Sequence, residues 1–119
     1  MPPVPFLQVV TNQDIATTEA RADFMRAASG RVAELLAKPE RFCMVRLETG
    51  QSLLFAGTDE PAAFADLSSL GLPAGETQRL SGGLCDLLSA HLGVKPERVY
   101  IHFRDVERPM WGHNRTTFG

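Results

Sequence analysis

The tetrapeptide Lys-Pro-Glu-Arg occurs twice in this 119-residue chain, at residues 38–41 and 95–98. Each copy follows a leucine-bearing run with helical spacing and precedes an apolar run typical of a strand, over residues 42–47 and 99–104. A match of four residues is weak by itself, but the same order of flanking elements around both copies indicates a duplicated unit. The sequence therefore predicts two copies of a β-α-β unit folded together.

The fold class that follows is mixed α/β (α+β), in one domain over residues 1–119. The two units span about 5–56 and 61–104, and a C-terminal tail covers 105–119. This length suffices for one modest core. The net charge of −2 argues against a nucleic-acid partner, which requires a basic face. No apolar run reaches the roughly 18 residues of a spanning helix, so we expect no membrane partner.

The first residues and the cysteines bear on the compartment. Residues 1–5 contain three prolines and neither a basic nor a long apolar segment, so they do not form a secretory signal. Cys43 and Cys85 have no CxxC spacing, which favours free structural thiols in a reducing cytosol over a disulfide. We expect a cytoplasmic protein whose release would not use a signal peptide.

Periodicity predicts the individual elements. In chain order these are a strand over 6–11 buried on both faces, a helix from Thr17 or Thr18 to about Ala37, a strand over 42–48, a short return strand over 52–55, a strand within 62–70, a helix over 76–92 and a strand over 99–104. The second helix has leucines on one face and Gly93 at its C-terminal cap. The first helix has the same apolar spacing and ends before Pro39.

The last predicted strand has a period of two. Tyr100, His102 and Arg104 point to one side, and we expect this polar, aromatic face of a central strand to line a pocket. The tail over 109–119 carries aromatic residues but is too short for another helix. We expect it to pack on a neighbouring subunit.

An ordered set of short motifs covers nearly the whole chain. These are Met1-Pro2 or Val4-Pro5, Thr11-Asn12, Lys38-Pro39, Phe55-Ala56-Gly57, Glu60-Pro61, Ser69-Leu70-Gly71, Arg98-Val99-Tyr100-Ile101, Asp105 and Thr117-Phe118. No single motif is specific, but in this order and spacing the chain resembles the macrophage migration inhibitory factor branch of the tautomerase superfamily. The resemblance implies a homotrimer in which three sheets form a central barrel with the helices outside. It also implies keto–enol tautomerisation of phenylpyruvate-type or dopachrome-type substrates, which are small aromatic keto or enol acids, without a cofactor.

The site implied by the resemblance lies between subunits and is built around an N-terminal proline. The implied catalytic residues are Pro5 or Pro2, with Lys38. The implied substrate-binding residues are Ser69, Leu70, Tyr100, His102, Trp111 and Phe118. An N-terminal proline provides a rigid secondary amine, and an α-amino group titrates at about 7.7–8.0 before burial or a nearby cation lowers its pKa. Without the resemblance, Lys38 is best interpreted as a cation at a helix C-terminus.

The proline is the main departure from the family pattern. Counting back from Thr11-Asn12 places the family's proline at Pro5, behind four further residues. A proline inside a chain has an amide nitrogen and is not a base. Three resolutions remain open: translation begins at Val4 and this residue is removed, Met1 alone is removed and Pro2 reaches the pocket, or the base is lost.

Two further departures limit the function. His102 stands where the best-known mammalian members carry asparagine, and it adds an imidazole that donates a hydrogen bond. The CxxC of the mammalian protein is absent, which excludes thiol oxidoreductase chemistry, and the three histidines lack ligand spacing, so we expect no metal. The alternatives to a tautomerase are a trimeric signalling or binding protein with a vestigial pocket, and a superfamily hydratase or dehalogenase using residues such as Arg104.

Overall fold

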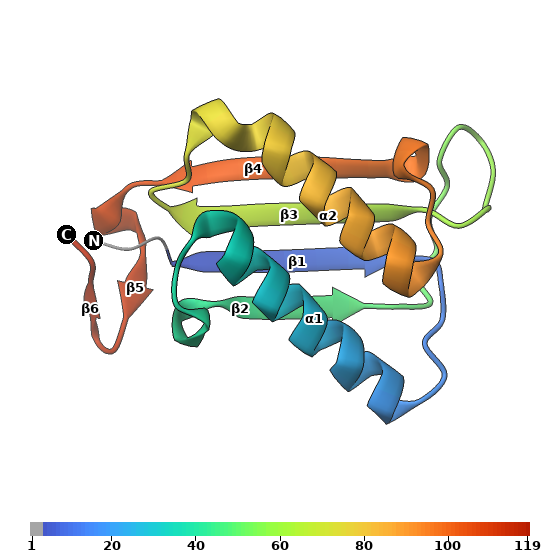
Figure 1. Cartoon of the computed structure of the whole chain (residues 1–119), viewed down its shortest axis with the longest axis horizontal. Helices are drawn as coiled ribbons and strands as arrows, with labels where there is room; N and C mark the ends of the chain where they lie inside the picture. Colours follow the sequence, from blue (N-terminus) through green and yellow to red (C-terminus); the bar gives the residue numbers. More distant parts are fainter. Residues whose placement is uncertain (1–3) are drawn as a thin grey trace.

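The computed structural model describes residues 4–119 and consists of two β-α-β units side by side. The first unit contains β1 (Pro5–Thr11), α1 (Thr18–Leu36) and β2 (Met44–Glu48), and the second contains β3 (Ala63–Leu70), α2 (Thr77–Leu92) and β4 (Val99–Val106). Strands within each unit are parallel, and β1 pairs antiparallel with β3, giving the order β2-β1-β3-β4 (Figure 1). The mixed fold class predicted from the repeat is confirmed.

The repeated tetrapeptide forms the exit from each helix. Ala37 and Gly93 end α1 and α2 in the left-handed conformation, with φ of 54° and 66°. The 3₁₀ turns η1 (Glu40–Phe42) and η3 (Pro96–Arg98) follow and lead into β2 and β4. Because a proline disfavours helical backbone at the residue before it, Pro39 and Pro96 stop the chain from continuing either helix.

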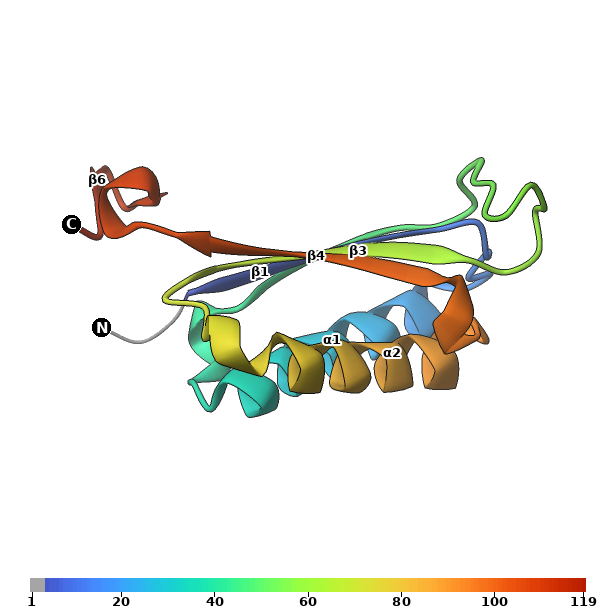
Figure 2. The same cartoon turned by 90° about the horizontal axis from the view of Figure 1, so that it is seen from above.

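Both helices cover the same face of the sheet (Figure 2), and the core lies between the helices and the sheet. The predicted leucine face of α2 is buried, at Leu80, Leu84, Leu87, Leu88 and Leu92. On β1, Leu7 and Val9 point into this core, while Phe6, Gln8 and Val10 are half-buried on the other face. The expectation that β1 is buried on both faces was therefore wrong for the single chain, because helices cover only one side.

The position of β4 also differs from the prediction. It is an edge strand rather than a central one, with β3 as its only partner in the four-stranded sheet. Tyr100, His102 and Arg104 do share one face, as expected, and this is the face that the helices leave open. Their side chains are exposed because no element of the described chain covers that face.

The return strand predicted over 52–55 does not form. Only an isolated bridge joins Phe55 to Thr58, and the surrounding carbonyls are bound by side chains instead. Arg98 donates to the carbonyls of Pro61, Phe55, Thr58 and Glu60 at 2.9–3.3 Å. The Asn12 amide donates to the carbonyls of Leu53, Asp59 and Glu60 at 3.0–3.5 Å. These bonds fix a loop where the pattern suggested a ladder.

The tail turns back beside the beginning of β1. It contains the 3₁₀ turn η4 (Arg108–Met110) and a small hairpin of β5 (Gly112–His113) and β6 (Thr116–Thr117). Asn114 and Arg115 make its turn with φ of 50° and 70°, as a two-residue hairpin with the right-handed twist requires. Within residues 4–119, no helix combines the length and apolar character needed to cross a membrane.

Candidate functional site

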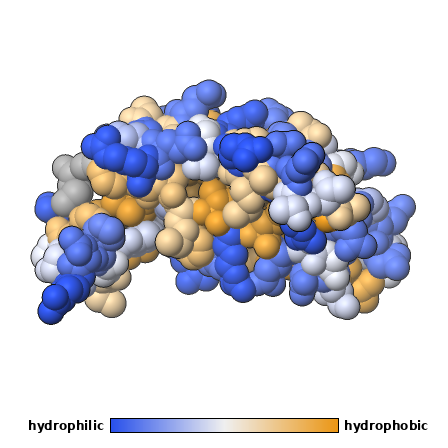
Figure 3. All heavy atoms as spheres, turned by 90° about the horizontal axis from the view of Figure 1, so that it is seen from below, coloured by the Kyte–Doolittle hydropathy of each residue, from blue (hydrophilic) through white to orange (hydrophobic). Residues whose placement is uncertain are grey.

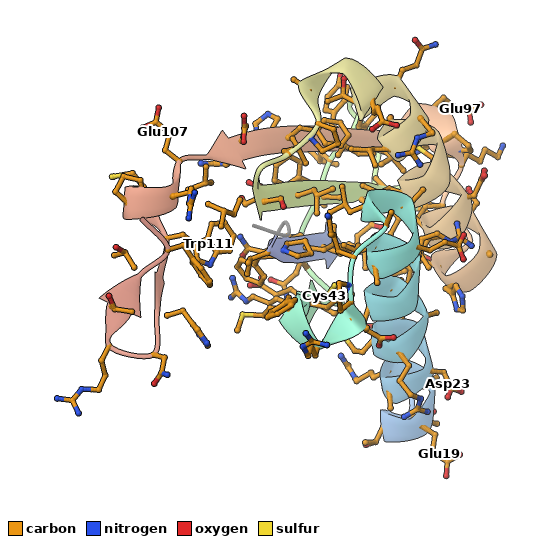
Figure 4. All side chains as sticks on the ribbon, turned by 60° about the vertical axis from the view of Figure 1, so that its left-hand side comes forward. Glu19, Asp23, Cys43, Glu97, Glu107 and Trp111 are labelled. Atoms are coloured by element: carbon orange, nitrogen blue, oxygen red, sulfur yellow. The ribbon has the colours of Figure 1, made fainter. Side chains whose placement is uncertain are left out.

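A cavity of about 350 Å³ lies where the tail meets the beginning of β1. Its walls come from the start of β1, from η1 with the start of β2, and from the tail hairpin. They are formed by Val4, Pro5, Phe6, Arg41, Phe42, Cys43, Met44, Trp111, Gly112, His113 and Phe118. In Figure 4, Trp111 lies between the tail and the first strand, with Cys43 on the side of β2.

Pro5 is the first residue of β1 and is less than 2% exposed. A proline is tolerated at this position because a strand's first residue need not donate to the ladder. Its Cα partner on β3 is Ser69, which is fully buried. The next residue, Leu70, donates its backbone N–H to the carbonyl of Val4 at 3.4 Å. The amide of Leu70 is therefore aimed at the peptide group that precedes Pro5.

The tail wall is held in place by its own hydrogen bonds. The N–H of Phe118 donates to the carbonyl of Trp111 at 3.2 Å, and Arg108 Nε donates to the carbonyl of Phe118 at 3.1 Å. The imidazole of His113 stacks on the ring of Phe118, with centroids 5.8 Å apart and planes within 4°. These contacts keep three aromatic side chains of the hairpin at the cavity.

The opposite wall carries a cation and a thiol. The guanidinium of Arg41 lies 4.7 Å from the ring centroid of Phe42, a cation–π distance. Burial raises the pKa of the Cys43 thiol, and the charge of Glu40 raises it further, so this thiol stays protonated at neutral pH. No carboxylate is found among the described residues that line the cavity.

The structure brings together three residues that the sequence analysis singled out: Pro5, Trp111 and Phe118. Ser69 and Leu70 adjoin Pro5 through the β1–β3 pairing, although both are buried and neither lines the cavity. Lys38 is half-buried just after α1 and is not among the lining residues. Pro2 lies outside the described residues.

Tyr100 and His102 lie toward the other end of the sheet. On β3, Ser69 pairs with Pro5 whereas Phe64 pairs with Tyr100. Five residues of strand separate these two positions, which is about 17 Å. Tyr100 lines a separate, mostly apolar cavity of about 450 Å³, with Leu53, Leu54, Phe55, Ala56, Ala63 and Phe64. One chain therefore does not unite Pro5 with Tyr100 or His102.

Sequence reasoning missed several residues of the Pro5 cavity. Phe42 and Met44 were assigned to a strand, and Cys43 was interpreted only as a structural thiol. Arg41 is the last residue of the first tetrapeptide. The equivalent residue of the second copy, Arg98, binds loop carbonyls instead, so the duplication did not indicate that Arg41 lines a cavity. His113 was considered only as a metal ligand; among residues 4–119 no group of His, Cys, Asp and Glu side chains is arranged to hold a metal.

Comparison with known proteins identifies the family. The family model described as "Macrophage migration inhibitory factor (MIF)" matches residues 4–119. A macrophage migration inhibitory factor homolog of Trichuris trichiura is 37% identical over 97% of this chain and 100% of that protein, and the mouse factor is 31% identical over 92% and 96%.

Solved structures give the same result. The structure of the factor from Trichinella spiralis has a TM-score of 0.86 and 35% identity, covering 95% of this chain and 99% of that one. A homologue from Prochlorococcus marinus also has a TM-score of 0.86, with 33% identity over 96% and 99% of the two chains. The chain therefore belongs to the macrophage migration inhibitory factor family, within the tautomerase superfamily.

Proposed function

We propose that the form of this chain whose first residue is Pro5 is a cofactor-independent keto–enol tautomerase acting on phenylpyruvate-type or dopachrome-type acids. The observation that carries this proposal is the position of Pro5. It begins a buried strand at a cavity whose walls include Trp111, Phe118, Phe42 and Phe6. An aromatic substrate fits such walls, and a rigid secondary amine at their edge is placed to move a proton.

The base is the amine of Pro5. A terminal α-amino group has a pKa of about 7.7–8.0 in model peptides, and apolar surroundings or a nearby cation lower the pKa toward the range useful for a general base. The amine takes a proton from the carbon next to the substrate carbonyl, so a C–H bond breaks and an N–H bond forms. The electron pair of the C–H bond forms the new C=C bond, and the π pair of the carbonyl moves to its oxygen. The proton held by the amine is then transferred to this oxygen, which completes the enol and restores the base.

The enolate oxygen requires a hydrogen-bond donor. In the full chain the amide of Leu70 donates to the carbonyl of Val4. A chain that begins at Pro5 has no such carbonyl, which leaves the Leu70 N–H free beside the amine. We assign this amide to the substrate, with the buried Ser69 holding its strand. Lys38, three residues before the cavity-lining Arg41, is proposed as the cation that supports the developing charge.

We further propose that the active form is a homotrimer, with Tyr100 and His102 reaching the Pro5 cavity from a neighbouring chain. Large apolar side chains support this assembly: Leu54, Tyr100, Met44 and Met110 are 71%, 67%, 64% and 76% exposed. Viewed from the side of β2, apolar surface gathers near the middle and beside the tail (Figure 3). Three sheets joined into a barrel would cover the open face and the edge strands.

The test compares two proteins of defined N-terminus, verified by mass spectrometry. One is expressed as Met followed by Pro5, so that removal of the methionine frees the proline, and the other retains Met1. The first should form enol from phenylpyruvate, and the Met1-retaining protein should have a kcat/KM at least about 100-fold lower, within the range of a lost general base, because its Pro5 nitrogen is an amide. Absence of turnover in the correctly processed, folded protein would refute the tautomerase.

The second candidate function applies to the chain that retains residues 1–4. There the nitrogen of Pro5 is an amide, and Val4 forms part of the cavity wall. That form is proposed to be a trimeric binding or signalling protein with a vestigial pocket. It should bind an aromatic acid without converting it, so turnover by the Met1-retaining protein would contradict this second function.

A further inference from the structure

Besides its apolar walls, the Pro5 cavity has basic side chains in its lining. The chain carries 14 acidic and 12 basic residues, yet the described residues lining this cavity include Arg41 and His113 and no carboxylate. Within residues 4–119, neither Arg41 nor His113 forms an ion pair with another residue. The geometry points to Arg41 and His113 as the pair that recognises a ligand carboxylate, which makes the cavity selective for aromatic acids over their neutral analogues.

Both side chains are braced against aromatic rings of the wall. The Arg41 guanidinium lies 4.7 Å from the centroid of Phe42, and the His113 ring stacks on Phe118. Stacking leaves the edges of a guanidinium and of an imidazole free to donate N–H groups in their own planes. Because the guanidinium and the imidazole each lie against an aromatic ring, less side-chain freedom is lost when a carboxylate binds.

The two donors come from different parts of the chain. Arg41 is in η1, between α1 and β2, and His113 is in β5 of the tail hairpin. They line the cavity from its two walls, and Pro5, at the start of β1, lines it as well. In the proposed complex, the ring of an aromatic acid packs among Trp111, Phe42 and Phe6, and its carboxylate accepts hydrogen bonds from Arg41 and His113.

The nearby acidic group does not cancel this polarity. Glu40 precedes Arg41 and is close enough for its charge to raise the pKa of Cys43. Its Oε1 atom lies toward α1, 4.0 Å from the position that a Cβ would take at Gly30. Glu40 is not among the residues lining the cavity, so among the described lining residues Arg41 and His113 are the basic groups and no carboxylate opposes them.

Trp111 allows this inference to be tested independently of catalysis. It is the chain's single tryptophan and it lines the cavity, so ligand binding should change its fluorescence. The probes are 3-phenylpropanoate and 3-phenylpropanamide, which cannot enolise and differ only in charge. The Pro5-start protein should bind the acid at least about tenfold more tightly than the amide, as expected for a charge-assisted hydrogen bond.

Substitutions assign the selectivity to the two residues. Arg41→Met replaces the guanidinium with an uncharged side chain and should remove most of the preference for the acid, because it weakens acid binding much more than amide binding. Arg41→Lys, which keeps the charge but loses the planar fork, should retain an intermediate preference. His113→Phe keeps the stack on Phe118 and should also reduce the preference. Arg21→Met, on the exposed surface of α1, is the matched control and should change neither affinity.

The possible outcomes distinguish this inference from the tautomerase proposal. Carboxylate binding can be tested without turnover, and only the relevance of that binding to turnover rests on the proposed function. Equal affinity of the native protein for acid and amide, or a preference for the acid that survives in both folded variants, overturns the inference. Acid-selective binding without turnover overturns the tautomerase alone. Turnover with equal kcat/KM for phenylpyruvate and its methyl ester overturns the carboxylate assignment alone. Circular dichroism of each variant establishes that it is folded.

Discussion

Arg41 and Arg98 occupy the same position in the two copies of one tetrapeptide, but their guanidinium groups make different contacts. Arg98 ends η3 and donates to four carbonyls of the loop that precedes β3, while its guanidinium lies 5.2 Å from the ring of Phe55. Arg41 lies on the Pro5 cavity. The backbone has the same arrangement in both copies, a 3₁₀ turn after each helix. The guanidinium of Arg98 has a structural role, and that of Arg41 has a proposed binding role.

Replacement of Arg98 should therefore be costly for stability. Arg98→Met leaves the loop carbonyls without their charged donor and should lower the free energy of unfolding by about 2–3 kcal/mol, the scale of lost hydrogen bonds to a charged group. Urea unfolding of the purified protein measures this difference. Arg26→Met, which breaks only an exposed ion pair with Asp23, should cost less than about 1 kcal/mol. Equal effects of the two substitutions would contradict the role assigned to Arg98.

At the level of elements, the sequence predicted what local periodicity and proline chemistry decide. Both helices, the alternation on β4 and the helix exits at Pro39 and Pro96 follow from such short-range rules. The loop over 52–55 did not, because side chains distant in sequence, Asn12 and Arg98, bind its carbonyls. The edge position of β4 depends on strand order, which periodicity does not encode.

The residues of the candidate site were likewise predicted only in part. Pro5, Trp111 and Phe118 were named through the family resemblance, and they meet in one cavity. Arg41 and His113 were not predicted as residues of this site, because their place depends on how η1 and the tail hairpin turn toward β1. The local sequence around these two residues does not indicate that they line the same cavity.

The duplicated helix ends offer a matched test of backbone strain. Ala37 and Gly93 have nearly the same left-handed conformation, which costs an L-residue roughly 1 kcal/mol and glycine almost nothing. Ala37→Gly should raise the free energy of unfolding by about 0.5–1 kcal/mol, and Gly93→Ala should lower it by about 1 kcal/mol. A Cβ at Gly93 would meet no atom within 4 Å, so packing does not confound the comparison. Denaturant midpoints that shift in the same direction would disprove this account.

At the scale of the whole molecule, the single chain leaves its surface incomplete. Within residues 4–119, one face of the sheet has no helix over it and the outer edges of β2 and β4 have no strand partner. Tyr100 lies about 17 Å along the sheet from the Pro5 position. Association of copies that joins the Tyr100 end of one chain to the Pro5 end of the next resolves all three features. Such a head-to-tail contact closes into a ring when the repeated rotation between copies completes a full turn.

Mixing two inactive variants tests whether each site is shared between chains. In the Pro5-start protein, Tyr100→Ala removes the proposed contribution of the neighbour. The second inactive variant is the chain that retains residues 1–4, in which the nitrogen of Pro5 is an amide and the base is absent. Each variant alone should be nearly inactive while still eluting at about three times the 13.0 kDa mass of one chain. Trimers refolded from an equal mixture should regain activity at about a quarter of their sites, since each intact site draws Pro5 from one variant and Tyr100 from the other. A mixture that is trimeric but remains inactive would place the whole site within one chain, and a monomeric native protein would remove the shared site altogether.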